Sequence, residues 1–183
     1  MLASTTDSNE VVVKLIDFEF AYQYGGDETY LDTGCYTSGY MPLECQRLDF
    51  AGTRAVVKNT PRGALDMFAA GIIMLALLAG DDIGSESQRD TRAIVVLLEE
   101  LMTDTSKYKT HRQRLARFVG FLNELGYYGS ECAAGEWQRG PLNQDMNGEA
   151  LDLLHRLTCR SVDARLTAAQ ALDHPFLTKS WEN

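Results

Sequence analysis

The run of residues 64–79 (ALDMFAAGIIMLALLA) constrains the fold most, because it is almost wholly apolar and its only charged residue is Asp66. The run is shorter than the roughly 20 residues that a membrane-spanning helix needs. Pro61 precedes it and Gly80 follows it, and both residues are typical helix start and stop signals. The pattern therefore predicts one helix over 64–79, buried in a protein core with neighbours on every side.

The segments after this run also show helical periodicity. Apolar residues recur at spacings of three and four within 91–102, 111–125 and 148–159, so each segment is predicted to be a helix. Thr167 and Gln170 have the spacing of a capping box, which predicts the start of a further short helix.

The N-terminal third has a different character. Residues 10–20 (EVVVKLIDFEF) are rich in β-branched and aromatic residues, which predicts a short buried strand. Residues 22–59 contain five glycines and show neither the helical nor the strand period. They are predicted to form a long irregular loop, and such loops are often functional. The expected fold is mainly α, a helical bundle around a buried central helix with a short β element at the N-terminus.

Composition excludes several classes of partner. Lys and Arg number 17 against 26 Asp and Glu, which gives a net charge of −9 at pH 7. This balance argues against nonspecific binding to nucleic acid or to an anionic membrane, because both need a basic surface. In 183 residues, 45% hydrophobic and 23% charged residues fit one globular domain or a large piece of one.

The cysteines and the N-terminus bear on the compartment. The four cysteines form no Cys-x-x-Cys pair and are predicted to be reduced packing thiols. The first ten residues are polar and lack the basic and apolar regions of a signal peptide. We expect an intracellular protein, cytoplasmic or nuclear.

Four segments in order along the chain then point to a family. They are residues 14–19 (KLIDFE), 37–44 (TSGYMPLE), 64–73 (ALDMFAAGII) and 165–176 (RLTAAQALDHPF). Together they resemble the C-terminal lobe of a eukaryotic protein kinase of the serine/threonine type. In that family the first resembles the strand that ends in Asp-Phe-Gly and the second the close of the activation segment. The third resembles the central helix and the fourth the end of the domain.

The resemblance implies a domain organisation. It predicts a partial protein kinase domain over residues 11–177, with a polar segment at 1–10 and a tail at 178–183. The activation segment would span about 17–44 and the central helix about 64–79.

The resemblance also implies a nucleotide site. Asp17 would hold Mg²⁺ against the phosphates of ATP, since a hard cation prefers oxygen ligands, and Phe18 and Glu19 would complete the cofactor-binding motif. The alternative is an ordinary Asp at the end of a strand. In the complete kinase the cofactors would be Mg²⁺ and ATP, whereas this chain alone is expected to bind neither tightly.

Structural roles follow for three further residues. Glu44 would anchor the activation segment by a buried ion pair with Arg165, or else both are solvated surface charges. Asp66 would accept backbone N–H bonds from the catalytic loop, or else it is an exposed Asp favoured at a helix start.

The activation-segment residues that the resemblance singles out are Thr33, Thr37, Tyr40 and Glu44. Thr37 would contact the catalytic Asp, or else is an ordinary loop hydroxyl.

The chain also departs from the kinase pattern. Glu19 replaces the Gly after Asp-Phe, and Pro42-Leu43 stand where Ala-Pro is expected. The sequence contains no Gly-rich loop, no Val-Ala-Ile-Lys lysine and no His-Arg-Asp-x-x-x-x-Asn loop, so the catalytic base is missing. Ten residues before Val11 are too few to build an N-terminal lobe, which is expected to be absent.

Three interpretations remain open. The chain is the C-terminal lobe of a serine/threonine protein kinase whose complete form transfers phosphate from ATP, a noncatalytic (pseudokinase) protein-interaction module built on helices within about 91–125, or an unrelated helical domain. On the first two, the expected partners are a protein substrate or regulatory protein and the missing N-terminal lobe.

Overall fold

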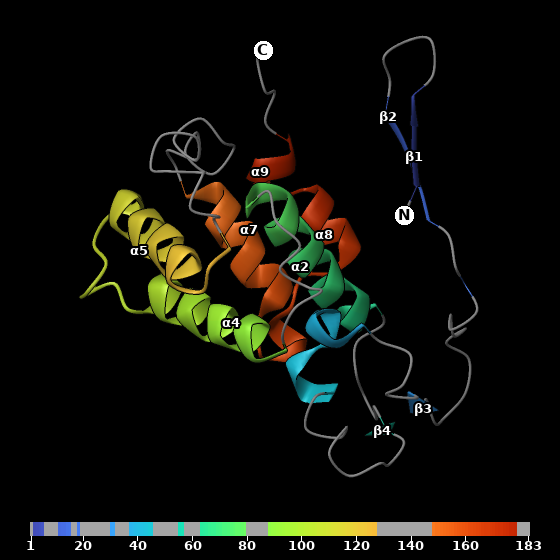
Figure 1. Ribbon diagram of the computed structural model, residues 1–183, viewed down its shortest axis with the longest axis horizontal. Helices are drawn as coiled ribbons and strands as arrows, with labels where there is room; N and C mark the ends of the chain where they lie inside the picture. Colours follow the sequence, from blue (N-terminus) through green and yellow to red (C-terminus); the bar gives the residue numbers. More distant parts are fainter. Residues whose placement is uncertain are drawn as a thin grey trace.

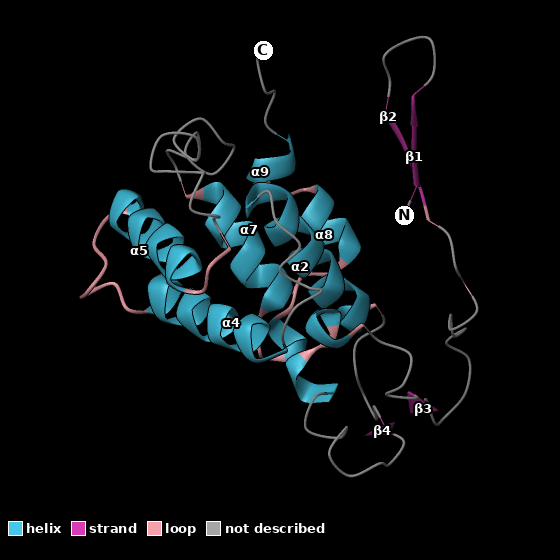
Figure 2. Ribbon diagram, in the orientation of Figure 1, coloured by secondary structure: helices cyan, strands magenta, loops and turns pink. Residues whose placement is uncertain are grey.

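A computed structural model of the chain describes its helical part almost throughout and shorter pieces of the N-terminal third. The described residues are 2–5, 11–15, 18, 30–31, 37–45, 55–56, 63–79, 88–127 and 148–178. Helix dominates this part of the chain (Figure 2), as the sequence predicts. None of the helices among these residues is long and apolar enough to cross a membrane.

The helices form one bundle (Figure 1). Its long members are α2 (Ala64–Ala79), α4 (Gln88–Thr103), α5 (His111–Glu124) and α7 (Glu149–Thr158). The short helices α8 (Ala168–Leu172) and α9 (Pro175–Thr178) follow α7. The predicted central helix is confirmed with the expected bounds, and α4, α5 and α7 lie within three residues of their predicted limits.

The largest core cluster fills the space between α2, α4, α5 and α7. Full burial of one Leu or Phe side chain stabilises a fold by about 1.5–3 kcal/mol relative to exposure, so this cluster is a main source of stability. Its most buried members are Leu75, Ile94, Leu98, Leu101, Phe118, Leu122, Leu151 and Leu154.

Helices α2 and α7 approach each other closely at Gly71. A Cβ atom at this position would lie 2.6 Å from Cγ2 of Thr158 and 3.0 Å from Cβ of Leu157. The first distance is well inside van der Waals contact, so the missing side chain of Gly71 is what lets the two helices cross here.

One face of α2 corrects the sequence prediction. The helix was expected to have neighbours on every side, but Leu77 is 76% exposed, and Ala70 is exposed as well. This face forms one wall of an apolar groove with a cavity volume of about 530 Å³. The other lining residues come from α7, α8 and α9 and include Leu153, Leu157, Ala171, Leu172, Phe176 and Leu177. Among the described residues, these elements line the groove and none covers it.

The N-terminal third contains two small antiparallel pairs. β1 (Leu2–Thr5) pairs with β2 (Val11–Lys14), with Leu2 opposite Lys14. β3 (Tyr30–Leu31) pairs with β4 (Ala55–Val56), inside the region predicted to be irregular. These pairings have too few residues to show a strand period.

The predicted burial of the strand region within 10–20 is wrong at its C-terminal side. Leu15 is 70% exposed and Phe18 is 65% exposed. In the described part of the chain, the sheet that contains β2 has two strands only, so no further strand flanks it.

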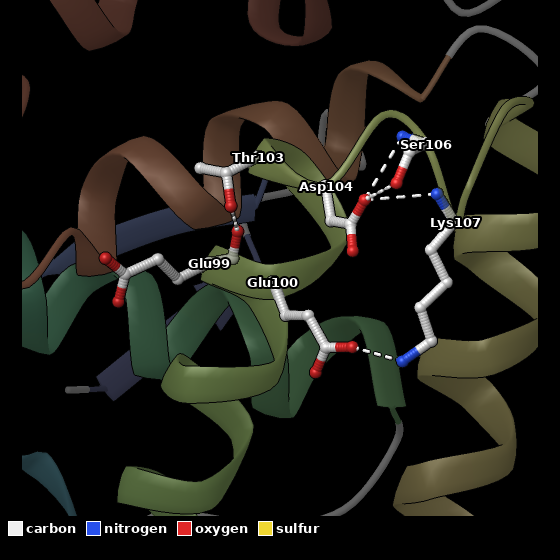
Figure 3. A network of polar contacts seen from close by, with 6 residues as sticks. All are labelled: Glu99, Glu100, Thr103, Asp104, Ser106 and Lys107. Carbon is white, nitrogen blue, oxygen red and sulfur yellow. Dashed lines mark hydrogen bonds and ion pairs between the residues drawn. The ribbon is translucent and has the colours of Figure 1, made fainter.

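Polar groups fix the ends of the helices. At α8, Oγ1 of Thr167 accepts a hydrogen bond from the Gln170 N–H, and the Gln170 side chain accepts one from the Thr167 N–H, which confirms the predicted capping box. Thr110 and Gln113 form a second capping box at α5. After α4 the chain turns around Asp104, whose Oδ1 accepts bonds from the N–H groups of Ser106 and Lys107, both 3.1 Å (Figure 3).

Candidate functional site

The Arg165 side chain is fully buried and uses every donor that it has. Its Nη1 and Nη2 donate to Oε1 and Oε2 of Glu44, at 2.9 Å and 3.2 Å, in a bidentate ion pair. Nη1 also donates to the Ala64 carbonyl (2.7 Å), and Nε and Nη2 donate to the Cys159 carbonyl (3.2 Å and 2.9 Å). Five hydrogen bonds therefore account for the five N–H groups of the guanidinium.

This arrangement joins three segments that are far apart in sequence. The first segment runs from Cys159, at the end of α7, through the 3-10 turn η4 (Val162–Ala164) to Arg165; the second begins α2 at Ala64, and the third contains Glu44. Glu44 lies 121 residues before Arg165 and is mostly shielded, with 24% of its side chain exposed. The ring of Phe68 lies under the guanidinium, with its centroid 5.2 Å from Cζ, in cation–π contact. The ion pair that the resemblance implies is thus present, and it fixes the segment containing Glu44 to the bundle.

The segment before Glu44 is also held against the helices. It contains the 3-10 turn η2 (Ser38–Tyr40), in which the Tyr40 N–H donates to the Thr37 carbonyl (2.9 Å). The buried Thr91 hydroxyl of α4 donates to the Gly39 carbonyl (2.9 Å). Tyr40 and Leu43 pack against an apolar cluster made by Phe68, Ile72 and Val95.

The Thr91–Gly39 contact was not found by sequence reasoning. Its only signal is a Thr at the start of the apolar periodicity of 91–102, where a buried hydroxyl needs an acceptor. The sequence does not say which carbonyl serves, because Gly39 is 52 residues away.

Cys45 is not a candidate nucleophile. Its side chain is buried next to Glu44, and burial, followed by the charge of Glu44, raises the pKa of the thiol to about 11. The thiolate is the reactive form, so this thiol stays protonated and inert near neutral pH. Cys45 and the half-buried Cys159 are free, in line with the predicted packing thiols, whereas Cys35 and Cys132 lie outside the described residues.

The structure places some of the other predicted residues. Thr37 is exposed and Tyr40 is half-buried. Asp66 is exposed in the first turn of α2, where the positive end of the helix dipole favours a carboxylate. This placement agrees with the alternative interpretation of Asp66 as an exposed residue at a helix start. Its contact with a catalytic loop stays a prediction. Asp17, Glu19 and Thr33 lie outside the described residues.

The described residues do not assemble a magnesium site. No group of three or more His, Cys, Asp or Glu side chains in this part of the chain could hold a metal ion. Phe18, between the two predicted acidic residues, is largely exposed. Asp17, the predicted ligand, lies outside the described residues, so the Mg²⁺ site stays a prediction.

The fold is a helical lobe of the protein kinase type, and the ion pair attaches the segment that contains Glu44 to it. The sequence matches the protein kinase domain family over residues 1–177, and the chain belongs to this family. This result and the helical structure confirm the kinase-like C-terminal lobe that the sequence motifs predict.

One relative adds detail. A probable serine/threonine-protein kinase of Dictyostelium discoideum is 37% identical over 62 residues, which is 34% of this chain and 9% of that protein. The matched part is thus a small fraction of the length of the relative. No solved structure matches the chain.

Proposed function

We propose that this chain is the C-terminal lobe of a serine/threonine protein kinase, and that the complete protein transfers a phosphoryl group from ATP to Ser or Thr of a protein. The observation that carries the proposal is the Glu44–Arg165 pair, because it fixes the close of the activation segment to the first turn of α2 and to the end of α7. A phosphoryl-transfer site depends mainly on positioning and electrostatic stabilisation, so a rigid support for this segment suits the activity.

The catalytic parts would come from elsewhere in the complete protein. The Gly-rich loop, the Val-Ala-Ile-Lys lysine and the catalytic base of the kinase pattern are missing from this sequence, and Mg²⁺ and ATP would bind where those parts meet Asp17. The isolated chain is accordingly proposed to be inactive. Its partners would be the N-terminal lobe and a protein substrate or regulator, in the cytoplasm or nucleus.

A noncatalytic, pseudokinase-like module is the alternative. Glu19 replaces the glycine of the nucleotide motif and adds a second carboxylate near Asp17. Pro42 and Leu43 also depart from the kinase pattern, yet Pro42 is buried and Leu43 packs against the Phe68 cluster. The helical lobe therefore accommodates Pro42 and Leu43 and keeps its shape, which a protein-binding role would require.

The experiment uses the longest natural protein made from the gene, together with its Asp17→Asn variant. On the kinase proposal, Mg²⁺-ATP raises the melting temperature, the protein phosphorylates Ser or Thr in a test protein, and Asp17→Asn lowers the rate by about 100-fold or more. Asp163→Asn, at an exposed position in η4, is the matched control and leaves the rate unchanged. A natural protein with neither nucleotide binding nor phosphate transfer would support the noncatalytic alternative.

A further inference from the structure

A polar cavity of about 530 Å³ lies where the close of the activation segment meets α4 and the turn after α7. This volume is within the usual range of ligand pockets, roughly 300–1,000 Å³. The cavity does not overlap the apolar groove, since the two share no lining residue. It is lined by Leu43, Glu44, Arg92, Glu99, Arg160 and Ser161.

The walls of the polar cavity are fixed in place by contacts described above. The Glu44 carboxylate is held by both terminal nitrogens of Arg165. The Thr91 hydroxyl, next to Arg92 in sequence, binds the Gly39 carbonyl and so joins α4 to the activation segment. A site with such walls is already formed before a ligand arrives, which reduces the entropy that binding costs.

The carboxylates of the cavity are already paired. Glu44 binds Arg165, and Oε2 of Glu99 accepts a hydrogen bond from Nη1 of Arg160 at 3.3 Å. Figure 3 shows the Glu99 carboxylate on the opposite side of α4 from the pair formed by Glu100 and Lys107.

Arg92 is the remaining charged side chain among the described residues that line the polar cavity. Its side chain is exposed, and in the described part of the chain no ion pair involves it. Among the described residues, two arginines and two glutamates line the cavity, and each glutamate is paired, Glu44 with Arg165 and Glu99 with Arg160. Arg92 is thus the charged group of this described lining that has no described counter-ion, in a chain whose net charge is −9.

We propose that the polar cavity binds one anionic side chain, a carboxylate or a phosphorylated Ser, of a protein segment that docks across residues 43–45 and α4. The Arg92 guanidinium would hold the anion in a bidentate contact, and the Ser161 hydroxyl would donate a further hydrogen bond. The Arg92 guanidinium, which has no counter-ion among the described residues, can neutralise one anionic group. The strongly acidic chain repels polyanions, so a peptide side chain suits the cavity better than a nucleic acid. The site lies outside the nucleotide motif and does not depend on phosphoryl transfer.

The test measures peptide binding to the full 183-residue chain without nucleotide. Three rhodamine-labelled peptides of identical sequence carry Glu, phosphoserine or Lys at the central position, and binding is followed by fluorescence anisotropy at low salt. We expect the Glu or the phosphoserine peptide, or both, to bind at least tenfold more tightly than the Lys peptide. The stronger of the two identifies the anion as a carboxylate or a phosphate.

Variants locate the binding. Arg92→Glu should lower the affinity for the anionic peptide at least tenfold, whereas Arg92→Lys should keep part of the affinity because it keeps the charge. Arg112→Glu, an equal charge change at an exposed position of α5 outside the cavity, should have little effect. Circular dichroism melting shows whether each variant is folded.

Equal binding of the Lys peptide, or an unchanged affinity in folded Arg92→Glu, would overturn the proposal. An equal loss in Arg112→Glu would also overturn it, because the attraction would then be a general charge effect. Since no ATP is present, none of these outcomes bears on the kinase activity of the complete protein.

Discussion

The Arg165 side chain makes five hydrogen bonds, more than any other side chain in the described part of the chain, so its substitution should lower the stability of the fold. Arg165→Ala would leave Glu44 and two carbonyls without their donor, and Glu44→Ala would leave a buried guanidinium without its counter-ion. Breaking a buried pair by removing one partner costs roughly 3–5 kcal/mol. We expect each variant to lose about 3 kcal/mol or more of the free energy of unfolding, measured by urea denaturation.

A double-mutant cycle separates the pair from the other contacts of Arg165. The double variant Glu44→Ala, Arg165→Ala should lose clearly less than the sum of the single losses. Arg165→Lys serves as the comparison, because it keeps the charge but not the planar fork that reaches Glu44 and Cys159 together. Additive losses would show that the two side chains are not coupled.

At the scale of elements, we expect opposite effects from the same substitution at two helical glycines, one at the crossing of α2 and α7 and one away from it. Gly71→Ala should destabilise the protein by about 1–3 kcal/mol, because the new Cβ would press on Thr158 and Leu157 and overpack the crossing. Gly120→Ala, in α5, adds a Cβ with no atom within 4 Å apart from its own chain neighbours and helix backbone, and should stabilise the protein by up to about 1 kcal/mol through helix propensity. Thermal unfolding of both variants gives the comparison.

Gly120→Ala is the control for helix propensity in this pair, since both substitutions make the same chemical change within a helix. A stabilised Gly71→Ala variant would mean that α2 and α7 can separate at this crossing without loss.

The elements also show which parts of the fold a sequence can predict. The limits of α2 and the capping box of α8 depend on residues within a few positions of each other, so local pattern finds them. The pairing of β3 with β4 joins two residues to two others across a long segment, and no period marks it. The open face of α2 was missed for a related reason, since an apolar surface shows no sign in the sequence of whether another element covers it.

The same contrast holds at the candidate site. Glu44 and Arg165 were paired in advance only through the resemblance to kinases, because no spacing rule joins residues 121 positions apart. The polar cavity could not be predicted, since Arg92, Glu99 and Arg160 share no motif and meet only when α4 packs beside the end of α7.

For the molecule as a whole, the apolar groove should govern solution behaviour. Leu77, Leu172 and Leu177 are 76%, 69% and 50% exposed, and surface of this kind promotes association. We expect the 183-residue chain to be poorly soluble and to bind the dye ANS, and the double variant Leu77→Lys, Leu172→Lys to bind less dye and stay monomeric at higher concentration. Dye fluorescence and light scattering measure both effects.

Val96→Lys is the matched control, because Val96 is 45% exposed on α4 and does not line the groove. It should change dye binding little. A wild-type chain that is monomeric and binds no dye would contradict the expectation.

The distance in sequence between Glu44 and Arg165 also sets a waiting time during synthesis. At about 5–20 residues per second, a ribosome needs roughly 6–24 s to proceed from Glu44 to Arg165, 121 positions later. Throughout that interval Met41 and Cys45, which are buried in the finished protein, belong to a segment whose main anchor has not yet been made. Chaperones should therefore bind the nascent chain most during the interval between the synthesis of Glu44 and the synthesis of Arg165.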